Sequence, residues 1–523
     1  MQKKILTYKE HLKNPNLIAV VIALLTTGSS RLQFSLGLPS TDSGLYSSVA
    51  QYIYYALNNG EDLKSMVLHL YQMMTFWVYG LEVNQIILLR LIDGLIAVAA
   101  SIILFKVILK ESGSTLFTII LVTTLLIIMN DSEIVVYGFT NSIWASYLPL
   151  FSALLVWQNA TKEDKYSFYL IGGLVSFGIL LREPFLPFFL LAGVAIFISY
   201  GWRVLLKYLI GSAILGFSVL AVVLSFRGWD LLNLINSYMH SATYFNENWG
   251  TAIEVTFKSN SLLAIKKGWF ICITALASII YIIKLYATDK NSVSMNHFFF
   301  WVLVALLPLM EPILKISFQY HFFNCLPGLA GLSAMGWRYI NSNVSKQLAT
   351  SSMIVISLMS LIVIVPSVNR NFIKSDYIYS LSDVAQWVKT PDSFRIKNSI
   401  ERSQYLTLAS KIYSLSREDS TLVVSGGMQV LYPLTELLPP TYELSELRYL
   451  FIQLNFDDDK LIKIIKKHQP TLIVTTDWYP GEADMSAIID KIDLYEKVGY
   501  VPTDSKKNYG WKSGIIYRLK DFE

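Results

Sequence analysis

Apolar residues fill long stretches of the chain, and short polar connections separate these stretches. A helix that crosses a membrane needs roughly 20 mostly apolar residues, and on that criterion the pattern predicts about 11 transmembrane helices. They are expected at residues 16–34, 84–108, 114–130, 141–158, 166–181, 184–200, 204–226, 268–287, 296–314, 319–338 and 347–366. Gly28 and Arg31 interrupt the first helix, and Arg182-Glu183-Pro184 separates the fifth from the sixth, since charges resist burial in a membrane.

The pattern changes after Pro366, where charged residues become frequent and long apolar runs stop. Three short apolar runs predict strands, and a stretch between the first two has apolar residues at helical spacing. In chain order these segments are residues 421–427, 457–468, 470–476 and 514–519. We therefore predict a transmembrane domain over residues 1–375, followed by a small α/β domain over residues 376–523.

The connection between the first two spans, residues 35–83, contains a further helical pattern. Apolar side chains recur there three or four residues apart, which is typical of an amphipathic helix lying in the membrane interface. They are Tyr46, Val49, Ala50, Ile53, Tyr54 and Leu57. Residues 66–79 are interpreted as a second interfacial helix, because a span there would reverse the orientation of every later helix. Asp42 opens the first of these helices, where it can cap the helix, take part in chemistry, or do both.

Composition supports a membrane protein with many spans. The chain has 523 residues, of which 53% are hydrophobic and 15% are charged, whereas soluble domains carry about 25% charged residues. The net charge of +5 is explained by basic loops on one side of a membrane and predicts no nucleic-acid partner. Cys272 and Cys325 lie in apolar segments, so we expect no disulfide framework and no zinc site.

Lysine and arginine residues set the predicted orientation, because they accumulate in cytoplasmic loops. The amino-terminal tail and the basic connections after alternate spans fall on one side, which we predict to be the cytoplasm. The α/β domain and residues 35–83 then lie outside. Some cations nevertheless fall on the outer side. Each alone is explained by a long side chain reaching the interface, but together they predict an outward-facing anion site: Arg182, Arg227, Lys258, Lys266, Lys267 and Lys315.

Two outer connections offer polar side chains for a second ligand. Asp131 and Glu133 lie in the short connection after the third span and are interpreted either as acceptor or metal contacts or as a solvated turn. His240 and Tyr244 lie in a long outer loop that we expect to close over the acceptor. The sequence contains no Walker motif and no dinucleotide-binding fingerprint, so no nucleotide cofactor is expected.

The segment around Asp42 resembles the first outer loop of bacterial GT-C class glycosyltransferases, which use polyprenyl-phosphate sugars as donors. The similarity covers residues 41–46, with the sequence Thr-Asp-Ser-Gly-Leu-Tyr, and residues 49–53. Many relatives carry a second acid directly after the first, where this chain has Ser43. Many also have an Asp-His-Lys-Pro patch, of which only Asp62-Leu63-Lys64 and His69 remain here. The resemblance therefore implies neither a metal requirement nor a particular sugar.

Two later motifs extend the resemblance over most of the chain. Residues 319–330 place Tyr320 and His321 before a Leu-Pro step and are similar to the family's late helix. Residues 180–185 place Arg182 between two mid-chain helices, like the basic residue of the family. An α/β tail on the outer side also fits a GT-C-like polytopic fold.

The resemblance implies an inverting glycosyltransferase in the bacterial cytoplasmic membrane. It would move a sugar from a polyprenyl-phosphate donor to a surface glycan such as O-antigen, with lipid A or protein as further acceptors. Asp42 is the expected general base, since a carboxylate accepts the proton of an attacking hydroxyl. Cations stabilise the departing phosphate, and the residues expected to bind it are Arg182, Tyr320, His321, Lys266 and Lys267. No metal or other cofactor is indicated.

Two other functions remain open. A polysaccharide polymerase or ligase also acts outside on lipid-linked glycans, although such enzymes usually rely on arginines of outer loops. A transporter or flippase would carry ionisable residues deep in the membrane. Asp93 and Glu311 are the acids deep enough to be considered for that role.

Overall fold

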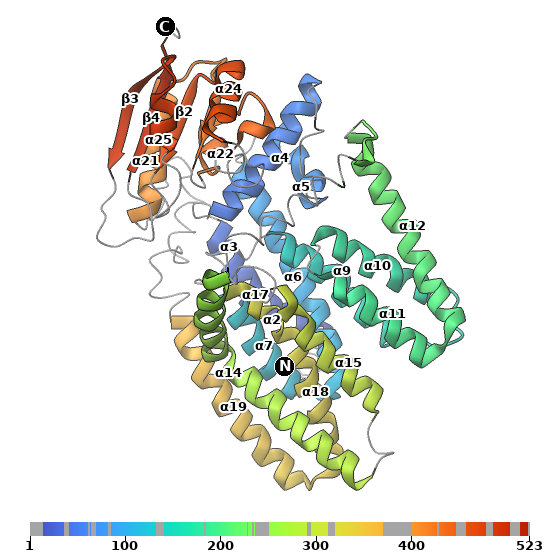
Figure 1. Ribbon diagram of the computed structural model, residues 1–523. Helices are drawn as coiled ribbons and strands as arrows, with labels where there is room; N and C mark the ends of the chain where they lie inside the picture. The colour runs from blue at the N-terminus through green and yellow to red at the C-terminus, as the bar shows by residue number, and fades with distance from the viewer. Residues whose placement is uncertain are drawn as a thin grey trace, which may run out of the picture. The chain divides into compact units, whose positions relative to one another are not determined.

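A computed structural model describes most of the chain (Figure 1). The described residues are 14–35, 41–60, 63, 70–81, 85–131, 141–182, 185–226, 228–232, 235, 250–289, 294–311, 319–369, 400–425, 428–445, 457–476, 485–502 and 513–520. The chain divides into two compact units. Unit 1 comprises Met1–Leu36, Arg90–Leu220 and Trp249–Asp392, and unit 2 comprises Gly37–Leu89, Ala221–Asn248 and Ser393–Glu523.

Unit 1 contains the long apolar helices, apart from the first residues of α6 and the last residues of α12. The first begins at Pro15, where Asn14 caps the amino terminus by accepting a hydrogen bond from the Asn16 amide. It continues through a π-helical turn that ends at Gly28, where the sequence interrupts the first apolar run. The helices are α2 (Pro15–Ala23), η1 (Leu24–Gly28), α3 (Ser29–Ser35), α6 (Gln85–Ser112), α7 (Thr115–Met129), α9 (Asn141–Trp157), α10 (Ser167–Leu181), α11 (Leu186–Tyr200), α12 (Trp202–Phe226), α14 (Gly250–Thr288), α15 (Met295–Leu306), η4 (Leu307–Leu309), α17 (Gln319–Phe323), α18 (Leu326–Asn343) and α19 (Lys346–Val368).

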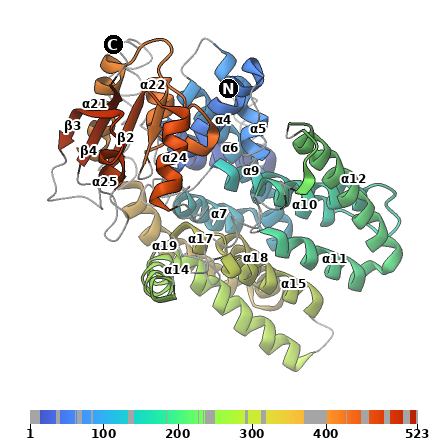
Figure 2. The same ribbon diagram turned by 45° about the horizontal axis from the view of Figure 1, so that its top comes forward.

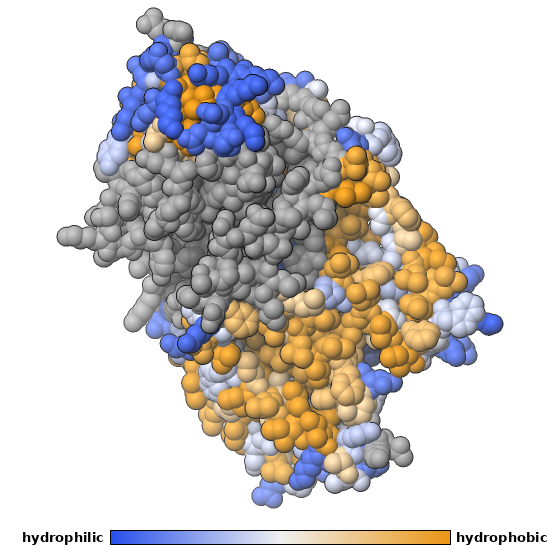
Figure 3. Space-filling model, in the orientation of Figure 1, coloured by the Kyte–Doolittle hydropathy of each residue, from blue (hydrophilic) through white to orange (hydrophobic). Residues whose placement is uncertain are grey.

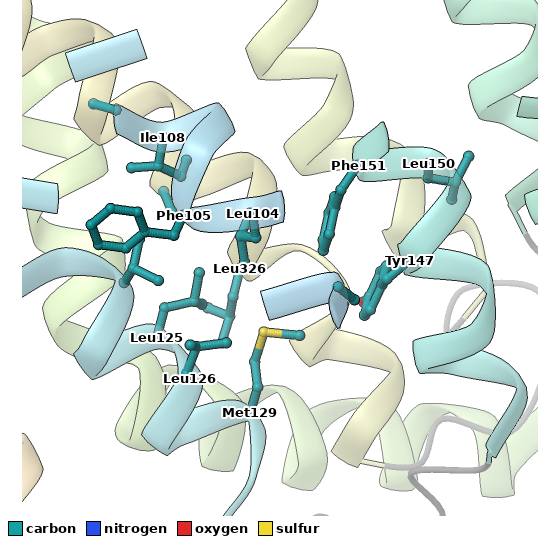
Figure 4. Packing of buried hydrophobic residues seen from close by; sticks show 14 of the residues in the cluster. Leu104, Phe105, Ile108, Leu125, Leu126, Met129, Tyr147, Leu150, Phe151 and Leu326 are labelled. Atoms are coloured by element: carbon teal, nitrogen blue, oxygen red, sulfur yellow. The ribbon is translucent and has the colours of Figure 1, made fainter. Parts of the chain in front are cut away.

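The core of unit 1 lies among α6, α7, α9 and α18. Figure 4 shows Leu104 and Phe105 of α6 and Leu125 of α7 packed near Leu326 of α18. Elsewhere in unit 1, glycine residues allow the backbones of two helices to come into contact. A Cβ atom on Gly172 of α10 would lie 2.0 Å from the backbone oxygen of Tyr208 in α12. Small residues at such crossings are typical of helix packing in membranes.

Several helices of unit 1 are apolar but expose much of their surface. Five are long and apolar enough to cross a membrane, judged by length and composition among the described residues, and shorter apolar helices accompany them. Only 11% of the apolar window in α19 is buried, and 17% of that in α12. Figure 3 shows the resulting hydrophobic surface over the helices of unit 1. Exposed apolar surface on this scale indicates contact with lipid.

Unit 2 contains a four-stranded mixed sheet and helices from two distant parts of the chain. The sheet has the order β1-β2-β4-β3, in which β1 and β2 are parallel and the other pairs are antiparallel. The elements are α4 (Thr41–Asn59), α5 (Leu70–Thr75), η2 (Phe76–Gly80), α21 (Ile400–Leu415), β1 (Leu422–Val424), α22 (Leu431–Thr435), η7 (Tyr442–Ser445), α24 (Asp458–His468), β2 (Leu472–Thr476), α25 (Met485–Asp490), β3 (Tyr495–Pro502) and β4 (Ser513–Leu519).

Helices cover both faces of this sheet, as Figure 2 shows. Side chains alternate between the faces of a strand, so Leu422 and Val424 pack on one side with α21 and α22. Val423 and Ile473 point to the other side and pack with α24 and α25. Burial on both faces explains why β1 and β2 read as continuous apolar runs in the sequence.

The observed helices agree with most of the predicted segments, although α14 begins at Gly250 rather than near residue 268. The segment predicted at 319–338 is two helices, α17 and α18, separated at Asn324 and Cys325. Within residues 66–79, the described part is the short α5 and η2, too short to span a membrane. The three predicted strands exist, and β3 was not predicted.

Candidate functional site

Charged and polar side chains gather where several helices of unit 1 begin or end. Arg182 follows the last residue of α10, and its main chain is extended there, which ends the helix. Glu311 lies just beyond η4, and His321 lies on the short α17. Asp131 lies just beyond α7, and Asp93 lies near the start of α6. In the predicted orientation, all these helix ends are on the outer side of the membrane.

Arg182, Glu311 and His321 form one buried cluster. Nη2 of Arg182 donates a hydrogen bond of 2.9 Å to Oε1 of Glu311. Nε2 of His321 lies 3.3 Å from the same oxygen. The side chains of Glu311 and His321 are each 2% exposed, so the carboxylate receives little compensation from water. Two residues predicted to bind phosphate are therefore brought together, and a carboxylate considered earlier only for a transporter joins them.

Two uncharged residues, Tyr147 and Asn324, form a hydrogen bond, and Asn324 is close in sequence to His321 of this cluster. The hydroxyl of Tyr147 donates to Oδ1 of Asn324, which follows His321 by three residues, at 2.5 Å. The Tyr147 ring also lies 5.5 Å from the ring of Phe185, three residues after Arg182. Among the described residues, Nδ2 of Asn324 has no hydrogen-bond partner although it is buried. Such an unused donor is uncommon in protein interiors.

Lys267 and Asp131 form a second buried ion pair. Nζ of Lys267 donates to Oδ1 of Asp131 at 2.9 Å, and the two side chains are 9% and 2% exposed. The sequence assigned Lys267 to the donor and Asp131 to the acceptor, whereas the structure places them in direct contact. Lys266 precedes Lys267 on α14, and its side chain is exposed, because consecutive helical residues point in different directions. The two lysines therefore do not act as a matched pair.

Arg31, on α3, is the centre of a third group. Nη1 of Arg31 donates to Oδ2 of Asp93 at 3.2 Å, and Nε donates to Oδ1 of Asn130 at 3.2 Å. Its guanidinium lies over the ring of Trp144, 5.6 Å from the centroid. The Ser30 hydroxyl also donates to the backbone oxygen of Asn130. The polar residues that interrupt the first predicted span thus attach it to the end of α7, next to Asp131.

Buried cations gather near the predicted outer helix ends. Arg31, Arg90 and Arg182 are buried, and the side chain of Lys267 is 9% exposed. The described carboxylates near them are Asp93, Asp131 and Glu311. Cations gathered at one end of the helices favour binding of an anion there.

Several predicted site residues lie outside the described residues. The backbone of Asp42 belongs to α4 in unit 2, but its side chain is outside the described part, as is the side chain of Tyr320 in α17. Glu133, His240 and Tyr244 lie entirely outside it. Their roles remain predictions. Among the described residues, no group of three or more His, Cys, Asp or Glu is placed to hold a metal ion.

Four residues of these groups were not predicted from the sequence: Arg31, Asn130, Asn324 and Tyr147. Arg31 could have been predicted, because an arginine within an apolar span is a buried charge that needs a partner in a membrane. The amides and the tyrosine carry no comparable signal, since such residues are frequent at helix ends and in membrane interfaces.

A separate cavity lies at the other end of the same helices. It has a volume of about 520 Å³ and is lined in part by Lys110, Glu111, His297 and Arg338. At a rise of about 1.5 Å per residue, Lys110 lies roughly 26 Å along α6 from Asp93. Nε2 of His297 is 3.4 Å from Oε2 of Glu111. In the predicted orientation this cavity faces the cytoplasm, so it is distinct from the outer cluster.

No family model and no curated protein matches the chain. Among solved structures, it is similar to the archaeal oligosaccharyltransferase AglB from Archaeoglobus fulgidus, determined in complex with an inhibitory peptide and a dolichol-phosphate. The identity is 11%, the match covers 97% of this chain and 74% of that chain, and the TM-score is 0.49. Similarity of this degree does not by itself assign a reaction.

Proposed function

We propose that the protein is an inverting glycosyltransferase of the GT-C type that takes a sugar from a polyprenyl-phosphate donor. The observation that carries the proposal is the group of buried cations at the predicted outer helix ends of unit 1, which suits a phosphate. A second support is the Asp42 segment, which resembles the acid-bearing outer loop of that family. The site would act outside the cytoplasm, on the outer side of a bacterial cytoplasmic membrane.

The proposed reaction needs one base and a stabilised leaving group. The acceptor hydroxyl oxygen forms a bond to the anomeric carbon of the donor sugar, and the carboxylate of Asp42 takes the hydroxyl proton. The bond between the anomeric carbon and the phosphate oxygen breaks, and its electron pair remains on the lipid phosphate. Attack from the face opposite the leaving group inverts the anomeric configuration. The activated donor supplies the driving force, so neither a nucleotide nor a metal cofactor enters the proposal.

Arg182 and Lys267 are the proposed contacts for the leaving phosphate. Arg182 presents a planar guanidinium that can bind phosphate through two hydrogen bonds. Glu311 holds this guanidinium through the contact at 2.9 Å, and the leaving phosphate would compete with the carboxylate for it. His321, next to the same carboxylate, and Tyr320 would add hydrogen-bond donors, and Lys266 would act from the exposed face of α14.

The proposed acceptor is a cell-surface glycan of the O-antigen kind. Its hydroxyl groups would contact Asp131, Glu133, His240 and Tyr244, with Asp131 held in place by Lys267. The α/β domain is proposed to lie outside the cytoplasm. The lipid bilayer holds both the enzyme and the donor, which explains why an interfacial helix would carry the catalytic carboxylate.

Replacing Asp42 by Asn tests the proposal, because the amide keeps the shape of the side chain but cannot accept the proton. Membranes containing the variant should transfer labelled sugar at least about a hundredfold more slowly, the scale at which general bases contribute. The Asp419→Asn variant changes an exposed acid of unit 2 and should transfer at the normal rate. Full transfer by the Asp42→Asn protein would remove Asp42 from the mechanism.

A further inference from the structure

Unit 2 contains a cavity between α4 and the segment that begins at α22. Its volume is about 360 Å³, within the range of about 300–1,000 Å³ found for small-ligand sites. Gln51, Tyr54, Tyr55 and Asn58 of α4 line one side, and Glu436 lines the other. Glu436 has a φ of 59°, so the chain turns in the left-handed region directly after α22.

The chemistry of the lining selects one class of ligand. Tyr54, Tyr55 and Tyr79 supply aromatic rings, and Gln51, Asn58, Asn59 and Gln85 supply amides. Amides both donate and accept hydrogen bonds, and aromatic faces attract the weakly positive C–H groups of sugar rings. No lysine or arginine is among the described residues that line it. The cavity therefore suits a neutral polyhydroxylated ligand rather than a phosphate or a lipid chain.

Part of this lining is buried and held in place by neighbouring residues, and it includes a hydrogen-bond acceptor that a ligand could use. Gln51 is 8% exposed, and its Oε1 has no hydrogen-bond partner among the described residues. A sugar hydroxyl could donate to this oxygen and satisfy it. The Tyr54 ring lies against Gly80, where a Cβ atom would be only 2.9 Å from Cε2. Tyr79 donates its hydroxyl proton to Ser47 at 3.1 Å, and burial raises its pKa, so it stays a neutral phenol.

Helix α4 carries both the proposed base, Asp42, and residues that line the cavity, so the distance between them can be calculated along the helix. Asp42 is in the first turn of α4, and Gln51 and Asn59 follow it on the same helix. At about 1.5 Å per residue, these positions are roughly 14 Å and 26 Å further along the helix axis. A single sugar at the base would not reach the cavity, whereas a chain of several sugars would.

We propose that this cavity binds neutral sugars of the acceptor, several units away from the hydroxyl that is glycosylated. The inference rests on the proposed function and names its acceptor as an oligosaccharide or polysaccharide chain. It assigns Gln51, Tyr54, Tyr55 and Asn58 to acceptor recognition, through one helix that carries both the base and the distal subsite.

Direct binding by the full-length protein tests the inference without any turnover. The purified protein in detergent is applied to a printed array of defined neutral and anionic glycans. We expect neutral oligosaccharides to bind, and the Tyr55→Ala and Asn58→Ala variants to bind them about tenfold more weakly. Both side chains are partly or fully exposed, so these variants should fold. Tyr413→Ala, which removes a tyrosine that is 69% exposed on α21, is the matched control and should bind normally.

Three results would overturn the inference: no bound neutral glycan, binding to anionic glycans alone, or neutral binding that survives both substitutions in the cavity. The Asp42→Asn protein separates this question from the proposed reaction. It should keep its array signal while losing transfer. If it transfers sugar normally, the proposed mechanism fails, and the array still decides whether the cavity binds glycan.

Discussion

Glu311 holds two buried side chains, so its replacement by Gln has a calculable effect. The substitution keeps the size of the side chain but removes the charge that faces Arg182 at 2.9 Å and His321 at 3.3 Å. Arg182 is 8% exposed and cannot regain full hydration. Breaking a buried ion pair by removing one partner costs about 3–5 kcal/mol. We expect the free energy of unfolding to fall by an amount in this range.

The same substitution should improve binding of an anionic lipid. Without the Glu311 charge, the cluster gains one net positive charge, and a phosphate no longer competes with a carboxylate for Arg182. Polyprenyl phosphate should therefore raise the thermal midpoint of the Glu311→Gln protein more than that of the native protein. A ligand present at a hundredfold excess over its dissociation constant stabilises a protein by about 2.7 kcal/mol. Thermal unfolding in detergent, followed by tryptophan fluorescence with and without the lipid, measures both effects.

Two controls separate charge from packing. Glu418→Gln neutralises an exposed acid and should change stability by less than about 0.5 kcal/mol. The double variant Arg182→Met/Glu311→Leu replaces the pair by apolar groups, which is often close to neutral for stability, but it should lose the response to polyprenyl phosphate. The reasoning is refuted if Glu311→Gln unfolds at the native midpoint, or if the lipid stabilises the double variant as strongly as the native protein.

Two further substitutions test the packing and the second ion pair. Gly172→Ala should lower the free energy of unfolding by about 1–3 kcal/mol or more, since the added Cβ would meet a backbone oxygen of α12. The control Gly216→Ala, on α12, meets nothing within 4 Å and should be neutral or slightly stabilising. Equal thermal midpoints for the two variants would contradict the close crossing. Asp131→Asn removes the carboxylate charge that Lys267 contacts at 2.9 Å and should lower the free energy of unfolding by about 3–5 kcal/mol. An unchanged thermal midpoint would show that the pair is open to water.

The length of the apolar runs predicted the helices, because the membrane allows few alternatives. A spanning segment must satisfy its own backbone hydrogen bonds, so run length and helix identity are closely coupled. Run length is a weaker guide to where a helix begins and ends. The sequence did not show that α14 begins at Gly250, because a polar amphipathic extension does not differ locally from a loop. It also missed β3, an edge strand that carries the adjacent charged residues Glu496 and Lys497 and contains Gly499 and Pro502.

The candidate site was predicted by residue type but not by pairing. Arg182 and His321 stood out as polar residues among apolar ones, and the structure places both beside Glu311. Their common partner lies 129 residues from Arg182 in the chain, and such long-range contacts leave no local signal. For the same reason, Lys267 and Asp131 were assigned to different ligands although they contact each other.

Photolabelling with a polyprenyl-phosphate sugar that carries a photoreactive group beside its phosphate tests the central claim most directly. Peptide mapping of the labelled full-length protein should find the label on the segment that contains Asp42 and on those that contain Arg182 or Lys267, and an excess of unlabelled polyprenyl phosphate should suppress it. Label that appears only around Lys110 and His297, at the opposite helix ends, would contradict the account.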